Sequence, residues 1–424
     1  MATLRVLYDI SGLGLGHVSP HGRGGSYRVD RHLAELLRAS PECELLFCAN
    51  HSSLAYASCV EYLRTQTELA HVPLLRHEDR WIARGLRHVT AAAHRRLKAL
   101  RGGRALPRVL RSGGAAIDAR VHRPMLDAAP PVDVYHSSTI PLPARAGRGR
   151  SPRRFVTIYD LRASREDASD AEIEYQRALV ESVTAGDCVI TSSDATRREL
   201  CGMGVADADR VFVVPLAVDR ATFHQRASAG LDAVRSRYGI PPRPYVLMLN
   251  NESPRKNRAR AIEAFARAVQ QEHLGEAILV LAGGLHSTDP AAAVVARWPA
   301  MRDRIVTTGY VNDDELASLY AGAMVFVYPS LYEGFGLPPL EAMQCGAPVI
   351  TANTSSLPEV VGDAGVMVDP RDVDALASAM LGLCADSTRR DAVRARSIAR
   401  AAEFSWERTA AGTIAAYRAA LARI

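Results

Sequence analysis

The sequence has no hydrophobic run that approaches the length of a transmembrane helix, and only 6% of its 424 residues are aromatic. Because a bilayer-spanning helix needs about 20 consecutive apolar residues, we expect no membrane span. The first residues, MATLRVLYDI, have neither a basic region nor a long apolar core, so we expect no signal peptide. The seven cysteines form no CxxC pair and have no histidine at zinc spacing. We therefore expect reduced thiols in a cytoplasmic protein.

The length and composition indicate a globular protein of two domains. The chain is too long for one ordinary core, and it is 48% hydrophobic and 23% charged. Short apolar segments alternate with helical patterns, which predicts an α/β fold of two doubly wound parallel sheets facing each other across a cleft. Strands are predicted at 4–10, 44–48, 132–136, 155–159, 188–191, 211–215, 245–249, 277–282, 305–308, 325–328, 349–351 and 365–368. The expected domains are 1–218 and 219–404, with an interdomain linker at 216–243 and a final helix, 405–424, crossing back to the first domain.

Positive charge is concentrated in one segment. Residues 76–123 contain thirteen arginine and lysine residues and only three acids, with apolar residues at near-helical spacing. An amphipathic basic helix fits an anionic membrane surface or a lipid-diphosphate acceptor at the inner face of the cytoplasmic membrane. A solvated surface helix is an equally good interpretation. Nucleic acid is disfavoured, because no stacking or recognition motif accompanies the charge.

A glycine-rich segment, SGLGLGHVSPHGRGGSYR, follows the first predicted strand. Its spacing is GxGxG and the predicted helix begins only at residue 29, so it does not match a dinucleotide-binding fingerprint. We expect a long flexible loop in which Gly24 and Gly25 let the backbone approach a phosphate. Arg28 is expected either to add a cation there or to lie on the helix surface.

Two DxD patterns could suggest a metal site. Asp207 and Asp209 fall in a turn before a predicted strand, whereas Asp372 and Asp374 fall at a helix start. Turn formation and capping explain both pairs, so we expect no metal and no other cofactor.

The most informative stretch is VFVYPSLYEGFGLPPLEAMQCGAPV, residues 325–349. It predicts a strand, a turn at Gly334 to Gly336, and a helix with Pro338 and Pro339 in its first turn. Gly346 is expected to end that helix. Free backbone amides and a helix N-terminus at one point form a site for phosphate.

Two carboxylates flank this turn. Glu333 and Glu341 would repel a phosphate unless each has a neutral partner, and sugar and ribose hydroxyls are such partners. The alternative for Glu341 is a first-turn acid favoured by the helix dipole. Arg255 and Lys256 follow another predicted strand, and the crevice at the strand ends should bring them to the same site to bind a diphosphate. A solvent-exposed basic pair is the alternative.

The segment EGFGLPPLE resembles the EX7E signature of the family 4 retaining glycosyltransferases, which have the GT-B fold. The neighbouring segments EAMQCGAPVI, SSLPEVVGDAG, ESPRKN and FSWERTA are similar to the family as well, and DVYHS and VFVVPLAVD match more loosely. The resemblance covers nearly the whole chain and is strongest from residue 245 onward.

The resemblance implies a role for each matching residue. Glu333 would contact and orient the donor sugar, and Glu341 would bind the ribose. The other donor-binding residues implied are Gly24, Gly25, Asn250, Arg255, Lys256, Tyr310, Val311, Gly334, Phe335, Gly336 and Leu337. Arg28, Tyr159 and Asp160 would lie on the acceptor or sugar side, although Asp160 could equally just finish a strand.

The chain departs from the family pattern at two positions. Asn250 stands where many relatives have arginine, and Tyr159 stands where many have histidine before Asp-Leu.

We therefore predict a retaining, metal-independent glycosyltransferase of the GT-B fold. It would move a hexose, with mannose from GDP-mannose as the best choice, to a glycan or lipid-linked glycan in surface polysaccharide biosynthesis. UDP-hexose or dTDP-hexose donors are alternatives. A non-catalytic subunit that binds a nucleotide sugar, a phosphorylase and an epimerase are the rival functions.

Overall fold

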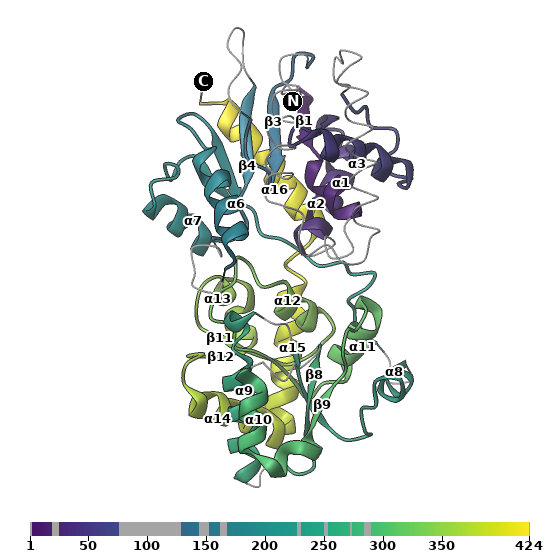
Figure 1. The fold of residues 1–424 in the computed structure, drawn as a ribbon, viewed down its shortest axis with the longest axis vertical. Helices are drawn as coiled ribbons and strands as arrows, with labels where there is room; N and C mark the ends of the chain where they lie inside the picture. The colour runs from purple at the N-terminus through teal and green to yellow at the C-terminus, as the bar shows by residue number, and fades with distance from the viewer. Residues whose placement is uncertain are drawn as a thin grey trace, which may run out of the picture.

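The computed structural model describes residues 2–18, 25–75, 129–143, 152–161, 168–226, 230–249, 253–271, 274–283 and 290–423. Figure 1 shows them as two lobes, each built on a sheet with helices around it. We call the lobe around the N-terminal sheet the first domain and the other lobe the second domain.

The first domain contains a parallel sheet of six strands in the order β2-β1-β3-β4-β5-β6. The strands are β1 (Leu4–Asp9), β2 (Cys43–Cys48), β3 (Val134–Ser138), β4 (Arg153–Thr157), β5 (Cys188–Thr191) and β6 (Val211–Val213). The described helices are α1 (Ser11–Val18), α2 (Gly25–Ala39), α3 (Ser53–Arg64), α6 (Asp170–Glu181) and α7 (Asp194–Gly202).

The second domain contains a parallel sheet in the order β12-β11-β10-β7-β8-β9. Its strands are β7 (Tyr245–Leu249), β8 (Ile278–Ala282), β9 (Ile305–Thr307), β10 (Val325–Tyr328), β11 (Val349–Ala352) and β12 (Val366–Val368). The described helical segments are α8 (Leu231–Tyr238), η4 (Pro254–Lys256), α9 (Arg258–Gln270), α10 (Pro290–Arg297), η5 (Pro299–Arg304), α11 (Asp313–Gly322), α12 (Leu337–Gln344), α13 (Leu357–Val361), η6 (Gly362–Ala364), α14 (Val373–Ala385) and α15 (Ser387–Ala401).

Inner strands of the second sheet are apolar along their whole length, as expected when helices cover both faces of a parallel sheet. All five residues of β8 and all four of β10 are buried. The strand order reverses between β7 and β10, and ligands of doubly wound sheets bind in the crevice at such a reversal. The predicted fold of two doubly wound parallel sheets is therefore confirmed.

The last helix, α16 (Trp406–Leu421), packs against the first domain, where it is drawn in yellow in Figure 1. The hydroxyl of Tyr417 lies 2.6 Å from Nδ1 of His136 on β3, and His136 Nε2 lies 2.7 Å from the hydroxyl of Thr157 on β4. Burial lowers the pKa of His136 to about 3, so the imidazole is neutral and joins the helix to two strands.

The prediction of a flexible loop at 11–28 was wrong for residues 11–18 and 25–28, while 19–24 lie outside the described residues. Ser11–Val18 is a helix, and the following helix begins at Gly25 rather than at residue 29. A Cβ on Gly14 would lie 2.5 Å from the Cys59 sulfur of α3. Glycine at this position therefore allows close packing of α1 on α3 rather than flexibility.

The segment 216–243, predicted as the interdomain linker, is more ordered than its composition indicated, and its role as the linker stays a prediction. The segment contains α8, and Val218, Phe223, Val234 and Ile240 are buried in the core formed with the second sheet. Charged residues between these apolar ones gave the sequence its linker-like appearance.

Several predicted features lie outside the described residues: the basic segment 76–123, Gly24 and Asn250. No helix within the described ranges has the length and hydropathy needed to cross a bilayer.

Candidate active site

A cavity of about 620 Å³ lies between the two domains. Such a volume is within the usual range for small-molecule sites. The second domain contributes Arg255, Lys256, Tyr328, Glu333, Gly334, Phe335, Gly336, Leu337 and Pro338 to its lining. The first domain contributes Gly25, Ser26, Arg28, Val29, Thr139, Thr157, Tyr159, Asp160, Glu172, Tyr175, Gln176, Leu179, Ser192 and Leu216.

The turn between β10 and α12 offers unused backbone amides to this cavity. The N–H groups of residues 334–337 donate no hydrogen bond to any described residue. Their carbonyl groups are occupied, since Ser356 donates to the Phe335 oxygen at 2.6 Å and Leu340 N–H donates to the Gly336 oxygen at 3.3 Å. The turn is thus fixed through its acceptors, and its donors remain for an anion at the α12 N-terminus.

The first domain holds the same turn at Gly334. Ser193 and Ser192 donate hydrogen bonds to the Gly334 carbonyl at 2.7 and 3.0 Å. A Cβ on Gly334 would lie 2.2 Å from the Tyr159 carbonyl oxygen and 2.6 Å from Asp160 Cβ. Only glycine fits here, because the backbones of the two domains meet at this residue.

Glu333 is the counter-ion of both basic residues. Its Oε1 accepts hydrogen bonds from Lys256 at 2.5 Å, Arg255 at 2.8 Å, Ser330 at 2.6 Å and Tyr328 at 2.8 Å. Its Oε2 has no hydrogen-bond partner among the described residues. One carboxylate oxygen therefore anchors the cluster, and the other is available to a hydroxyl group in the cavity.

The pKa shifts in this cluster follow from burial and charge. Burial raises the pKa of Glu333, but the attraction of Lys256 and Arg255 is stronger, and the net pKa is lowered. Burial lowers the pKa of Lys256, and Glu333 only partly restores it. Glu333 is thus ionised at neutral pH, next to cations that can neutralise a diphosphate.

Glu341 does not line this cavity. It is 3% exposed and lines a smaller adjoining cavity, which shares Arg28, Val29 and Leu337 with the larger one. Arg28 donates to Glu341 at 3.1 Å and to Asp313 at 2.9 Å. The sequence led us to expect both acids at one pocket, but Glu341, the fifth residue of α12, lines the adjoining cavity instead.

Tyr159 and Asp160 line the cavity from the end of β4, next to Gly334. The Tyr159 hydroxyl donates to Asp30 Oδ1 at 2.9 Å, and Ser138 donates to the same oxygen. Burial raises the pKa of Asp30 to about 7. The network fixes the Tyr159 side chain on the first-domain wall.

Comparison with known proteins decides the family. Residues 243–386 match the model described as "Glycosyl transferases group 1". The chain is 35% identical over 285 residues to the O-antigen chain mannosyltransferase B of Escherichia coli, covering 67% of this chain and 74% of that protein. The chain belongs to the group 1 glycosyltransferases.

Two further relatives agree with this assignment. The serotype-specific mannosyltransferase WbdA of Escherichia coli is 32% identical over 243 residues, which is 56% of this chain but only 29% of that protein. The sucrose-phosphate synthase of Thermosynechococcus elongatus has a TM-score of 0.64 at 19% identity and covers 100% of both chains. The fold is GT-B, with the cavity in its interdomain cleft.

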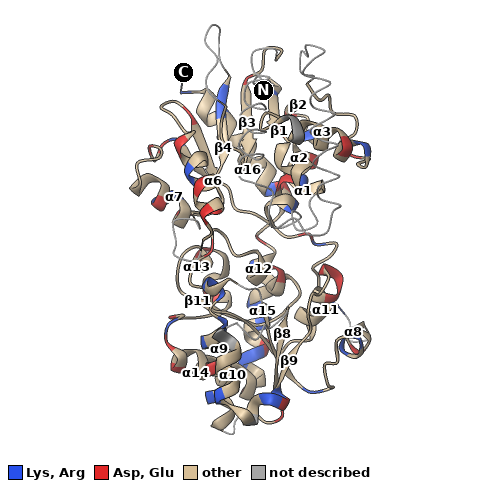
Figure 2. Cartoon of the chain, viewed as in Figure 1, with Lys and Arg blue, Asp and Glu red and all other residues tan. Residues whose placement is uncertain are grey.

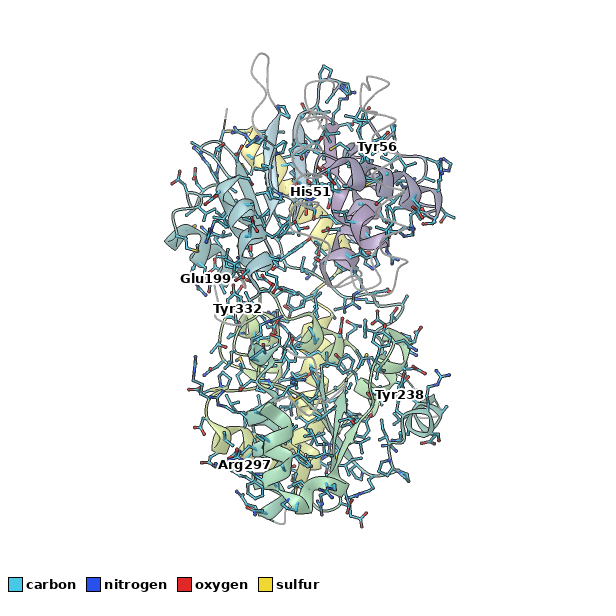
Figure 3. All side chains as sticks on the ribbon, in the orientation of Figure 1. His51, Tyr56, Glu199, Tyr238, Arg297 and Tyr332 are labelled. Carbon is cyan, nitrogen blue, oxygen red and sulfur yellow. The ribbon has the colours of Figure 1, made fainter. Side chains whose placement is uncertain are left out.

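A second contact joins the domains of this group 1 glycosyltransferase. The Glu359 carboxylate of α13 accepts hydrogen bonds from the N–H groups of Asp194 and Ala195, both at 2.7 Å. These N–H groups belong to the first two residues of α7, so an acid of the second domain caps a helix of the first. Nearby, Tyr332 donates to Glu199 at 2.9 Å; Figure 3 shows both side chains where the lobes meet.

Two predicted site residues of the glycosyltransferase lie away from the cavity. Tyr310 is 87% exposed and Val311 is half-buried, and neither lines the cavity. They follow β9, the edge strand, which β7 and β8 separate from β10.

Sequence reasoning missed Ser192, Ser193 and Tyr175. Ser192 and Ser193 could have been found only from their position directly after the predicted strand 188–191.

No three metal-ligating side chains gather within the part of the chain that the structure describes. Asp207 accepts a backbone hydrogen bond from Arg210 in a turn, and Asp372 caps α14 by accepting from Ala375 N–H at 2.9 Å. Both DxD pairs thus take part in local structure, and metal independence stays a prediction.

Proposed function

We propose that the chain is a retaining hexosyltransferase that moves mannose from GDP-mannose to a glycan or lipid-linked glycan in surface polysaccharide biosynthesis. One observation carries the proposal: the amides of residues 334–337 have no acceptor among the described residues and face a cavity that also contains Lys256 and Arg255. A helix N-terminus with two cations is suited to a diphosphate leaving group.

The proposed chemistry needs the cluster around Glu333. The amides, Lys256 and Arg255 stabilise negative charge on the β-phosphate as its bond to the anomeric carbon breaks. The acceptor oxygen bonds to that carbon from the same face, and its proton passes to the departing phosphate oxygen. Glu333 Oε2 accepts a hydrogen bond from a hydroxyl of the transferred sugar and orients the sugar for the attack of the acceptor.

The choice of sugar is supported by the two Escherichia coli relatives, which are both mannosyltransferases by name, and the choice of acceptor by the first of them, an O-antigen chain mannosyltransferase. GDP as the carrier and independence of metal ions rest on the family resemblance. Contact with an anionic membrane is proposed from the basic sequence 76–123.

The test is transfer by the purified protein from GDP-mannose, UDP-glucose and dTDP-glucose to mannobiose, with and without EDTA. We expect an α-linked mannosyl product from GDP-mannose alone, unaffected by EDTA. A β-linked product would refute retention, and no transfer from any donor would refute the function. Lys256→Ala should lose activity, whereas Arg302→Ala, a matched change of an exposed cation, should not.

We also propose that Glu341 binds the ribose, and that the backbone of Tyr310 and Val311 binds the base. Glu341→Ala should weaken GDP binding measured by calorimetry and leave the rate at saturating donor largely intact. Unchanged GDP affinity would instead assign Glu341 to holding Arg28.

A further inference from the structure

The first-domain wall of the cavity contains one face of α6. Glu172, Tyr175, Gln176 and Leu179 line the cavity and recur at the spacing of a single helical face. Tyr175 is 41% exposed, which is unusual for a large aromatic side chain in the described part of this domain. Figure 2 shows that α6 also carries acidic residues along its length. The wall therefore differs in chemistry from the cationic wall across the cavity.

The Tyr175 ring is held in place. Its hydroxyl donates a hydrogen bond to the carbonyl oxygen of Thr139, at the end of β3. Burial, followed by the charges of Asp30 and Asp9, raises the pKa of Tyr175 to about 12. The phenol thus stays protonated and keeps its role as donor at physiological pH.

Thr139 supplies a second, independent observation. It lines the cavity with a φ of 62°, a left-handed conformation that is rare for a β-branched residue. Backbone strain of this kind clusters at functional sites. The strained backbone presents the carbonyl to Tyr175, while the Thr139 hydroxyl donates to the Ser138 carbonyl at 2.6 Å. Ser138 in turn donates to Asp30.

We propose that Tyr175, positioned by Thr139, is the platform for the acceptor, and that the acceptor group bound there is a neutral pyranose. The inference rests on the proposed function, since it names the acceptor of that reaction. An aromatic face complements the C–H face of a sugar ring. Asp160 and Glu172 line the same wall, and their negative charge disfavours a phosphorylated acceptor.

The test uses kinetics at saturating GDP-mannose with mannobiose and, separately, mannose 6-phosphate as the acceptor. We expect Tyr175→Ala to raise the KM for mannobiose about tenfold or more, with the donor KM within about twofold of wild type. Tyr175→Phe keeps the ring and loses the hydrogen bond, so its acceptor KM should rise about twofold to threefold. Glu174→Ala is the matched control, because Glu174 is exposed on the same helix and does not line the cavity.

The outcomes separate the two proposals. Transfer by Tyr175→Ala with an unchanged acceptor KM, or preference of the wild type for mannose 6-phosphate, would overturn the acceptor inference alone. If the wild type transfers sugar from no donor to either acceptor, the proposed function fails and the inference fails with it. Should Tyr175→Ala not fold, Tyr175→Leu retains apolar bulk without a flat ring, and the same rise in KM is expected.

Discussion

Replacing Glu333 with glutamine removes one negative charge from the centre of the cavity and leaves its shape almost unchanged. The side-chain oxygen of glutamine can keep the four hydrogen bonds that Oε1 accepts. What is lost is the counter-ion of Lys256 and Arg255, whose side chains are only 9% and 15% exposed. Breaking a buried ion pair costs about 3–5 kcal/mol. Because Glu333→Gln keeps the hydrogen bonds, we expect it to lower the free energy of unfolding by about 3 kcal/mol.

This loss of stability should be measurable by thermal unfolding. For a domain of this size about 1 kcal/mol shifts Tm by about 2–4 °C, so Glu333→Gln should lower the Tm by about 6–12 °C at pH 7. The deficit should shrink toward pH 9.5, because burial lowers the pKa of Lys256 and loss of Glu333 lowers it further. A neutral Lys256 no longer repels Arg255.

The same variant tests the diphosphate site. GDP should raise the Tm of Glu333→Gln more than that of the wild type, because the diphosphate replaces the missing negative charge. Transfer should fall about a hundredfold, since an amide N–H₂ in the place of Oε2 cannot accept a sugar hydroxyl. A Tm equal to that of the wild type, or a loss of Tm that GDP does not restore, would refute the assignment of Lys256 and Arg255 to the leaving group.

Three further changes test the contacts around the cavity. Gly334→Ala should cost about 1–3 kcal/mol and raise the donor KM, since its Cβ would clash with Tyr159; Gly202→Ala, which meets nothing within 4 Å, is the control in denaturant unfolding. Glu359→Gln should weaken the cap of α7 by about 0.5–2 kcal/mol and enlarge the radius of gyration in small-angle scattering, and an unchanged radius would count against an interdomain role. Burial raises the pKa of Asp30 from 3.8 to about 7, so the folded state binds an extra proton between these values and stability falls as pH rises through them. Asp30→Asn should flatten that part of the pH dependence in urea unfolding, and an unaltered slope would contradict the shift.

Apolar periodicity was sufficient to predict most of the sheet. Three strands, Cys188–Thr191, Tyr245–Leu249 and Val325–Tyr328, have the predicted ends, because each is an apolar run bounded by polar or turn residues. Helices such as α15 were not predicted, since STRRDAVRARSIARA is strongly polar and buries only Val393, Ser397 and Ala401. The buried stripe is too narrow to stand out from the charge around it.

The candidate site also has a part that the sequence predicts and a part that it does not. The turn at Gly334 and the basic pair Arg255 and Lys256 were predictable, since their chemistry lies in short contiguous segments. The pairing of Arg28 with Glu341 joins residues 313 positions apart, and no local pattern indicates it. The Tyr175 contact with Thr139 depends likewise on a backbone conformation that the sequence does not reveal.

The return of α16 to the first domain affects how the chain can fold during synthesis. Ala410, Ile414, Tyr417 and Ala420 belong to the core of the sheet that starts at Leu4. Domains generally fold as units in the order in which they leave the ribosome. Here the first sheet lacks part of its core, and His136 lacks its tyrosine partner, until synthesis has passed residue 420. The residues that complete the core of the second sheet, up to Ala401, are therefore synthesised before those that complete the core of the first.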